Sequence, residues 1–263
     1  CSGGGTKDQP ARIIYPTFEK LFSYDKRGRK VLETDVAEGE SYVTISGYDE
    51  AGNLVARTDK ERRVTGYTYD DLNRLKVVTD ALLGETGYTY DSRDNLTALT
   101  DAKNQTTRFE YDRNNRLVKE IRPEGQETSY AYDAAGSLVQ KIDAKNQKTV
   151  YEYDHAGRLT EIRYFATSDD TGPAKTVTFT YDAAGNLVSI TYADGSLERW
   201  EYDASGNVNE WVNRRGQSVQ YALDSEGRVT SRTYEDGTTA SFTYDARGNM
   251  VRRTDQAGYD WHF

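Results

Sequence analysis

The chain has 263 residues, of which 34 are basic and 43 acidic, and its formal net charge is −9 at pH 7. The charges are mixed along the sequence and form no basic stripe, which argues against a nucleic-acid partner. Leu, Ile, Val and Phe together stay below the ~20% that separates most folding chains from disordered ones. The 21 Tyr residues, however, supply large amphipathic rings, so composition predicts Tyr-rich sheet surfaces in place of an oily core.

The N-terminal segment reads CSGGGTKDQP and contains the sole Cys of the chain, Cys1. This start resembles a mature bacterial lipoprotein, whose signal peptide is cut just before a Cys that becomes lipid-modified. The resemblance implies a lipid anchor on Cys1, a flexible tether over 1–10, and an extracellular or outer-membrane location. No other membrane contact is expected, because no run of ~20 apolar residues is present. The alternative interpretation is an arbitrary fragment boundary.

Residues 11–263 are predicted to form one domain, which from residue 24 onward is organised by a repeated Tyr-Asp pair. The pairs begin at Tyr24, Tyr48, Tyr69, Tyr90, Tyr111, Tyr132, Tyr153, Tyr181, Tyr202 and Tyr244, and Leu223 occupies the one missing position. The first step is 24 residues, the step from Tyr153 to Tyr181 is 28, and all the others are 21. A fixed period of this kind indicates a repeat protein.

Each Tyr-Asp pair is predicted to end a strand and to start a tight turn. Four residues after the Tyr stands Gly, Asn or Asp, the residue types that adopt positive φ at least cost. This predicts a type I turn with a G1 bulge, in which the Asp carboxylate accepts the N–H two residues later. The structural residues assigned on this basis include Tyr153, Asp154, Gly157, Tyr181, Asp182, Gly185, Tyr202, Asp203, Gly206, Tyr244, Asp245 and Gly248.

A second turn is expected fourteen residues after each Tyr, where Gly or Asn recurs, as in DAKNQ at 101 and 143. Aromatic residues two positions before the Tyr share its face, because strand side chains alternate. Each repeat is then two strands of about seven residues, too short for the crossovers of a parallel sheet. The predicted fold class is all-β, an antiparallel meander of about eleven 21-residue hairpins.

The segments YDHAGRL at 153–159, YDAAGNL at 181–187 and YDARGNM at 244–250 resemble the signature of the RHS or YD-repeat family. The resemblance extends over residues 24–263. It implies a sheet strip that coils as a wide spiral, an open or partial barrel, as in bacterial toxin cocoons and teneurin barrels.

Catalysis has little support in the sequence, and we expect no enzyme activity and no cofactor. His155 occupies a variable turn position and His262 lies beside the C-terminal residue, so neither has an evident nucleophile or base partner. The recurrent Asp residues have a backbone role, which argues against a glycosidase carboxylate pair. DAKNQ and SDDTG crowd oxygen ligands into loops but lack calcium-binding spacing, so no metal is expected.

Function is expected where the pattern breaks. Seven extra residues lengthen one loop, at 163–176, and such a loop is either neutral drift or a binding feature. Trp261 and Phe263 are predicted to form an assembly edge, open to strand addition. Trp200 and Trp211 raise glycan binding as an alternative, although packing of the sheet itself explains their strand positions.

These observations favour a non-enzymatic structural or adhesive protein of the bacterial surface. Its expected partners are other copies of itself, joined head to tail into a fibre or tube, or other cell-surface components, with glycans as a further candidate. The alternatives are a fragment of an RHS toxin shell that encloses cargo and a carbohydrate-binding surface lipoprotein.

Overall fold

The computed structural model describes residues 9–172 and 174–263, so the predicted anchor Cys1 lies outside the described residues. Within them the chain forms 24 β-strands, and every strand pair in the register is antiparallel. The predicted all-β hairpin meander is thus confirmed. The chain divides into two compact units, which meet in sequence between Glu127 and Thr128. Each unit is described by itself.

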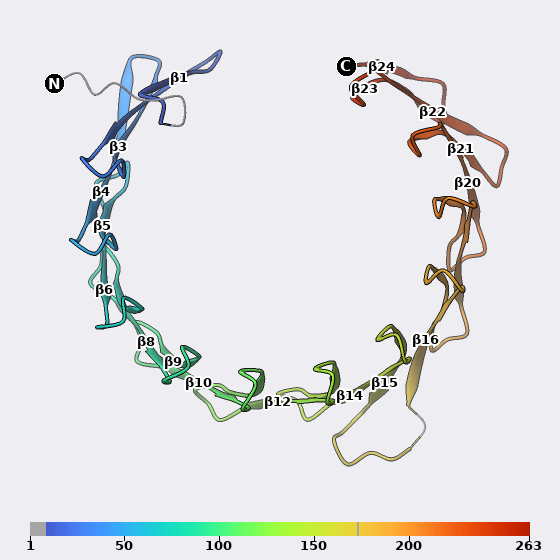
Figure 1. The fold of residues 1–263 in the computed structure, drawn as a ribbon, viewed down its shortest axis with the longest axis horizontal. Helices are drawn as coiled ribbons and strands as arrows, with labels where there is room; N and C mark the ends of the chain where they lie inside the picture. The colour runs from blue at the N-terminus through green and yellow to red at the C-terminus, as the bar shows by residue number, and fades with distance from the viewer. Residues whose placement is uncertain (1–8, 173) are drawn as a thin grey trace. The chain divides into compact units, whose positions relative to one another are not determined.

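The first unit contains strands that follow one another in chain order along a curved strip, from dark blue to green in Figure 1. Their bounds are β1 Arg12–Ile14, β2 Glu19–Tyr24, β3 Lys30–Ala37, β4 Glu40–Tyr48, β5 Leu54–Thr58, β6 Val64–Tyr69, β7 Leu75–Thr79, β8 Glu85–Tyr90, β9 Leu96–Thr100, β10 Thr106–Tyr111 and β11 Leu117–Ile121.

The second unit repeats the arrangement. Its strands are β12 Glu127–Tyr132, which starts one residue before the unit boundary, β13 Leu138–Ile142, β14 Lys148–Tyr153, β15 Leu159–Phe165, β16 Lys175–Tyr181, β17 Leu187–Thr191, β18 Leu197–Tyr202, β19 Val208–Val212, β20 Ser218–Leu223, β21 Val229–Tyr234, β22 Thr239–Tyr244, β23 Met250–Thr254 and β24 Asp260–His262.

Most strands have five or six residues, shorter than the seven expected, because turns and bulges take up the difference. In the hairpin of β14 and β15, Glu152 pairs with Glu161 and Tyr153 pairs with Leu159, which leaves Thr160 as the bulged residue. The 24-residue first step has a different cause. The hairpin of β3 and β4 is longer and turns through Glu38 and Gly39, both at positive φ, as a type I′ turn requires.

The 28-residue step lengthens strands as well as a loop. We expected a loop over 163–176, but β15 continues to Phe165 and β16 already begins at Lys175. Two residue pairs, Lys148 with Phe165 and Thr149 with Tyr164, extend the β14–β15 ladder at this end. They form because these residues face one another across the sheet and complete backbone hydrogen bonds that a loop would leave open.

Side chains alternate across the sheet with period two, as the sequence pattern predicts. In β18, Glu198, Trp200 and Tyr202 are half-buried, whereas Arg199 and Glu201 between them are exposed. On the aromatic face, Trp200 lies directly opposite Trp211. Among the described residues only Ala240, Phe242 and Thr128 are buried. The sheet is therefore stabilised by contacts between neighbouring strands, without a packed second layer.

Candidate functional site

The Tyr-Asp turn is built from three backbone-directed interactions, as the turn after β14 shows. Gly157 N–H donates to the Asp154 carbonyl at 3.0 Å, and Asp154 N–H donates to the Arg158 carbonyl at 2.9 Å. Asp154 Oδ1 accepts the N–H groups of Ala156 and Arg158 at 2.9 and 3.0 Å. Gly157 has φ +77°, where a Cβ would be strained. This geometry is a type I turn with a G1 bulge.

The other predicted turn residues occupy the same geometry. Gly185, Gly206 and Gly248 have φ of 95°, 83° and 85°. The carboxylate of each turn Asp accepts the N–H four residues later, in Asn186 for Asp182, Asn207 for Asp203 and Asn249 for Asp245. The side chain at that later position, Asn or Arg, also donates to the second carboxylate oxygen of the Asp.

The hydroxyl of the repeated Tyr joins consecutive repeats, a role that the sequence did not reveal. Tyr153 Oη donates to the Leu138 carbonyl at 2.9 Å. The ladder between β13 and β14 runs only from Ile142–Lys148 to Gln140–Val150, so Leu138 lies beyond its end. The Tyr hydroxyl therefore satisfies a carbonyl that no strand neighbour reaches. Equivalent bonds are made by Tyr69, Tyr90, Tyr181, Tyr202 and Tyr244.

Arg residues of one turn stack on the Tyr of the next repeat. The Arg158 guanidinium lies 4.7 Å from the Tyr181 ring centroid, while its Nε donates to Asp154 at 2.7 Å. Such a contact combines a cation–π attraction with a fixed fork of donors. The N–H groups and guanidinium of Arg158 lower the pKa of Asp154, and burial raises the pKa of Tyr153. These groups stay charged and neutral respectively near neutral pH.

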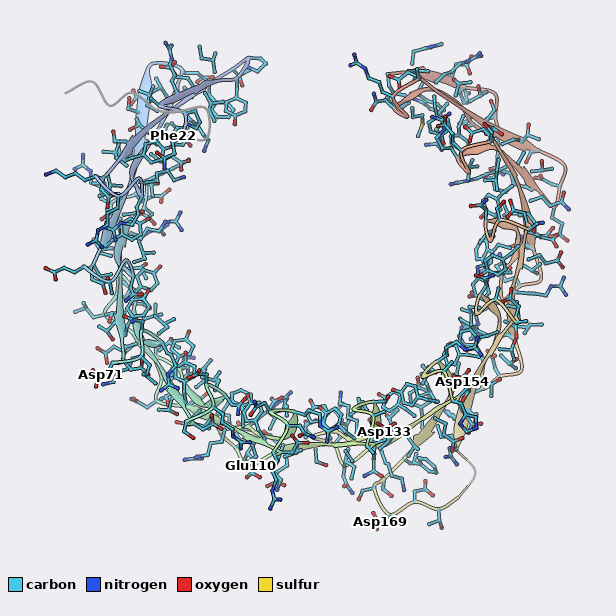
Figure 2. All side chains as sticks on the ribbon, in the orientation of Figure 1. Phe22, Asp71, Glu110, Asp133, Asp154 and Asp169 are labelled. Carbon is cyan, nitrogen blue, oxygen red and sulfur yellow. The ribbon has the colours of Figure 1, made fainter. Side chains whose placement is uncertain are left out.

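The interruption of the period produces the most distinctive local feature, a hairpin that projects beyond its neighbours. Figure 2 shows Asp169 on the loop between β15 and β16, away from the curved strip of its unit. Lys148 secures this hairpin: its Nζ lies 4.4 Å from the Phe165 ring centroid and donates to the Asp170 carbonyl at 3.0 Å. The base of the hairpin is thus held by packing and a charge-assisted hydrogen bond.

A hollow of about 380 Å³ lies at the base of this hairpin. It is lined by Tyr164 and Lys175 from the extended strands, by Val177, and by Tyr192, Ala193, Asp194 and Arg214 from the two following turns. Arg214 stacks on the Tyr192 ring at 3.9 Å and bonds to Asp194 through Nη2 at 2.7 Å. Burial and the neighbouring Glu198 raise the pKa of Tyr192.

The sequence contained a signal for this hollow that the repeat alignment passed over. Second turns usually begin with Asp or Asn, as at Asp143 and Asn213, whose side chains accept turn N–H groups. At Tyr192 and Tyr234 an aromatic ring takes that position. Asp194, two residues after Tyr192, then accepts the Ser196 N–H at 3.0 Å and holds the turn instead. The substitution frees a ring to line a surface.

Two other hollows occur in the second unit. One, of about 460 Å³, lies beside Tyr234 and is lined further by Trp211, Asn213, Gln217, Ser218, Val219, Glu235, Asp236 and Gln256. The other, of about 880 Å³, is open and lies between the Tyr-Asp turns at 182–186 and 203–207. Its carboxylates Asp182 and Asp203 are engaged in their own turns, so it presents fewer free polar groups than its volume suggests.

The remaining candidates are dispersed over the described part of the chain. His155 lies exposed in a Tyr-Asp turn and His262 on β24. Trp261 pairs with Arg253 across β23 and β24, and Phe263 N–H donates to the Val251 carbonyl. Asp101 of DAKNQ accepts the N–H groups of its own turn. No group of three potential metal ligands was found among the described residues.

Nor do the described residues include a helix of the length and apolarity needed to cross a membrane.

Comparison with solved structures finds the same fold in a toxin component. The crystal structure titled TcdB2-TccC3-TEV aligns over 94% of this chain with a TM-score of 0.63 and 16% identity. The Photorhabdus luminescens Tc holotoxin pore, with the mutation TccC3-D651A, also aligns over 94% of this chain, with a TM-score of 0.58 and 17% identity. The chain spans only 16% of each of those chains. At these identities the likeness concerns the fold alone.

Family models identify the repeats. The Teneurin YD-shell model matches residues 122–213. No curated protein matches the sequence at a significant level. The RHS Repeat model matches residues 48–85, 70–106, 90–127, 202–239 and 224–259, which together exceed half of the chain. The tyrosine-asparagine and tyrosine-arginine turn geometry described above supplies the physical basis of these matches, and the chain belongs to the RHS repeat family.

Proposed function

We propose that this chain is a structural, non-enzymatic segment of the wall of an RHS-type shell. The observation that carries the proposal is the uniform bonding of each repeat to the one before it. Tyr90 reaches Leu75 and Tyr202 reaches Leu187 in the same way, in different units. A sheet bonded in this manner extends by adding repeats, and its stability needs no separate core.

Two further observations support this role. The YD-shell model and the solved toxin components match the repeats themselves, and the chain spans a small share of those longer chains. The carboxylates that recur in every repeat are occupied by turn N–H groups and by Arg or Asn side chains. Carboxylates held in this way are poor candidates for acid–base chemistry, which requires groups free to exchange protons with a substrate.

Surface attachment through Cys1, adhesion and head-to-tail fibre formation are the competing hypotheses. To separate them, the native protein would be captured from its source cells with an antibody raised against residues 9–263. Its intact mass would then be measured, and the particles imaged by electron microscopy. The wall proposal predicts a chain several times longer than this sequence and compact hollow particles.

A native chain of 29.7 kDa with a lipid on Cys1 would contradict the wall proposal and support the surface lipoprotein. Filaments that grow with protein concentration would support the fibre hypothesis, in which strand edges pair between copies. Filling of the particle by a second protein segment, visible after limited proteolysis as a protected fragment, would extend the wall proposal to enclosure of cargo.

A further inference from the structure

The hollow beside the projecting hairpin contains positive charge that the surrounding residues do not use up. Lys175 is exposed on its rim and forms no ion pair within residues 9–172 and 174–263. Arg214 bonds to Asp194 through Nη2 and to Ser196 through Nε, at 2.7 and 2.9 Å. A guanidinium has five N–H donors, so Arg214 keeps donors for a further acceptor.

Aromatic rings line the same hollow. Tyr164 is 44% exposed and stands directly opposite Lys175 across the β15–β16 ladder. Tyr192 is half-buried, with Arg214 stacked on its ring, and its Oη donates to Glu198 at 3.3 Å. Flat apolar walls with a few fixed polar groups are the usual composition of small-ligand sites, and the volume of about 380 Å³ lies in their range.

The site is held in shape before any ligand arrives. Lys148 fixes the base of the projecting hairpin through Phe165 and the Asp170 carbonyl. Asp194, Ser196 and Tyr192 together fix the guanidinium of Arg214. Because the charged groups are already positioned, little conformational entropy is lost when a ligand binds.

The chain contains a second copy of this turn without the positive charge. Tyr234, Asp236 and Thr238 repeat the arrangement of Tyr192, Asp194 and Ser196, and Thr238 accepts from Gln256 at 3.3 Å just as Ser196 accepts from Arg214. The hollow beside Tyr234 is lined by Glu235 and Asp236 and contains no Lys or Arg. The difference between the two hollows is therefore mainly one of charge.

We propose that the hollow formed by Tyr164, Lys175, Val177, Tyr192 and Arg214 binds a carboxylated sugar unit of an acidic glycan. The carboxylate accepts hydrogen bonds from Arg214 and Lys175, the pairing that a planar guanidinium favours. The C–H face of the sugar ring lies against the tyrosine rings and Val177. This site is independent of the wall function, because it depends on one insertion and not on the repeats.

The proposal is tested by calorimetric titration of the full chain with trigalacturonate, with neutral galactotriose as the uncharged counterpart. Arg214→Gln converts the site into the form found naturally beside Tyr234, and Lys175→Gln removes the rim charge. Each is expected to weaken trigalacturonate binding at least about tenfold, as expected for loss of a charged hydrogen bond. The neutral trisaccharide is expected to bind more weakly than trigalacturonate to the unmodified chain.

Matched controls decide whether the binding is local. Tyr234→Ala alters the uncharged hollow and leaves trigalacturonate affinity unchanged if the proposal is right. Inorganic phosphate, added as a competitor, should displace trigalacturonate only weakly, since it lacks a ring. Absence of binding, equal affinity in Arg214→Gln and Lys175→Gln, or an equal loss in Tyr234→Ala would each overturn the proposal. Circular dichroism of every variant verifies that the sheet is retained.

Discussion

At the scale of single residues, the repeated Tyr and Asp have different tasks in the same turn. Asp154 binds within its own turn, to N–H groups and to Arg158. Tyr153 reaches the preceding repeat and satisfies the Leu138 carbonyl. The pair therefore couples the formation of a turn to the attachment of its repeat, which explains why the two residues recur side by side.

Tyr153→Phe tests the coupling, because it removes the hydroxyl and keeps the ring. We expect the free energy of unfolding to fall by about 1 kcal/mol, the usual net value of such a hydrogen bond. Tyr151→Phe is the matched control, since Tyr151 lies two residues earlier on the same strand and its hydroxyl has no hydrogen bond to a described residue. Urea titration followed by tyrosine fluorescence measures both. Equal losses in the two variants would contradict the proposed role of the Tyr153 hydroxyl.

The turn carboxylates also make stability depend on pH. The pKa of Asp154 is lowered from its ordinary value of 3.8, first by the Arg158 N–H and then by its guanidinium, and Asp70, Asp112 and Asp224 are lowered by the same kind of contact. A carboxyl with a lower folded pKa binds its proton more weakly when folded. Its contribution to stability is therefore complete above the ordinary value and is lost as pH falls through the folded pKa.

Melting temperature is accordingly expected to stay flat above about pH 5 and to fall steeply below the ordinary carboxyl pKa. Asp154→Asn should make that decline shallower, because one of the coupled carboxylates is gone. Asp169→Asn, in the exposed loop, is the control and should leave the profile as it is. A scan of melting temperature between pH 3 and pH 7 measures the effect, and identical profiles for all three proteins would count against it.

At the scale of elements, both turns of each repeat use the same backbone geometry but with different tolerance. In the turn at 80–84, Leu83 occupies the position that Gly or Asn takes in the other second turns but for Arg62, with φ of 65°. Its side chain is 81% exposed and that of Leu82 is 90% exposed. A Leu in this conformation is strained by its Cβ and gains nothing from burial.

Leu83→Gly is therefore expected to stabilise the protein by about 1 kcal/mol, by relieving the left-handed strain. The reciprocal control is Leu82→Gly, which lies one residue earlier, outside the left-handed region, and gains only chain entropy in the unfolded state. It should be neutral or destabilising. Thermal unfolding monitored by circular dichroism compares the two, and stabilisation by both or by neither would show that strain at Leu83 is not the cause.

At the scale of the whole molecule, stability is distributed along the sheet, because each hairpin contacts only its neighbours. The ladders between repeats, such as Val77–Gly87 to Thr79–Glu85, contain three residue pairs, and those within repeats usually contain four. No interaction in the described residues links distant repeats of one unit through a common core. Proteins of this kind gain stability in nearest-neighbour steps.

Removal of one complete repeat should consequently be tolerated, provided that the side-chain phase is kept. Deletion of Asp91–Tyr111 removes 21 residues and joins Tyr90 to Asp112, which restores a Tyr-Asp turn. Deletion of Asp91–Glu110 removes one residue fewer and shifts the turn by one position. The shifted variant is expected to lose about 2 kcal/mol more, since a one-residue slip exchanges the two faces. Urea titration measures both, and equal stability would contradict the phase requirement.

Much of this architecture could be predicted from the sequence, because the determinants are local. A turn that needs positive φ leaves Gly157 or Asn146 in the chain, and alternation places Tyr151 and Tyr153 on one face. The period therefore predicted antiparallel hairpins and the class of the fold. The strand lengths were overestimated, and the extension of β15 to Phe165 was missed, since a residue inside an insertion has no counterpart to be aligned with.

Contacts between repeats were decided only by the tertiary structure. The bond from Tyr153 to Leu138 and the stacking of Arg158 on Tyr181 depend on how strands separate beyond the last ladder pair, which no spacing encodes. The same holds for the hollow that brings Lys175 next to Tyr192 and Arg214 from two later turns. Sequence alone determined the hairpins because each closes on itself, whereas the surface between hairpins exists only after they pack side by side.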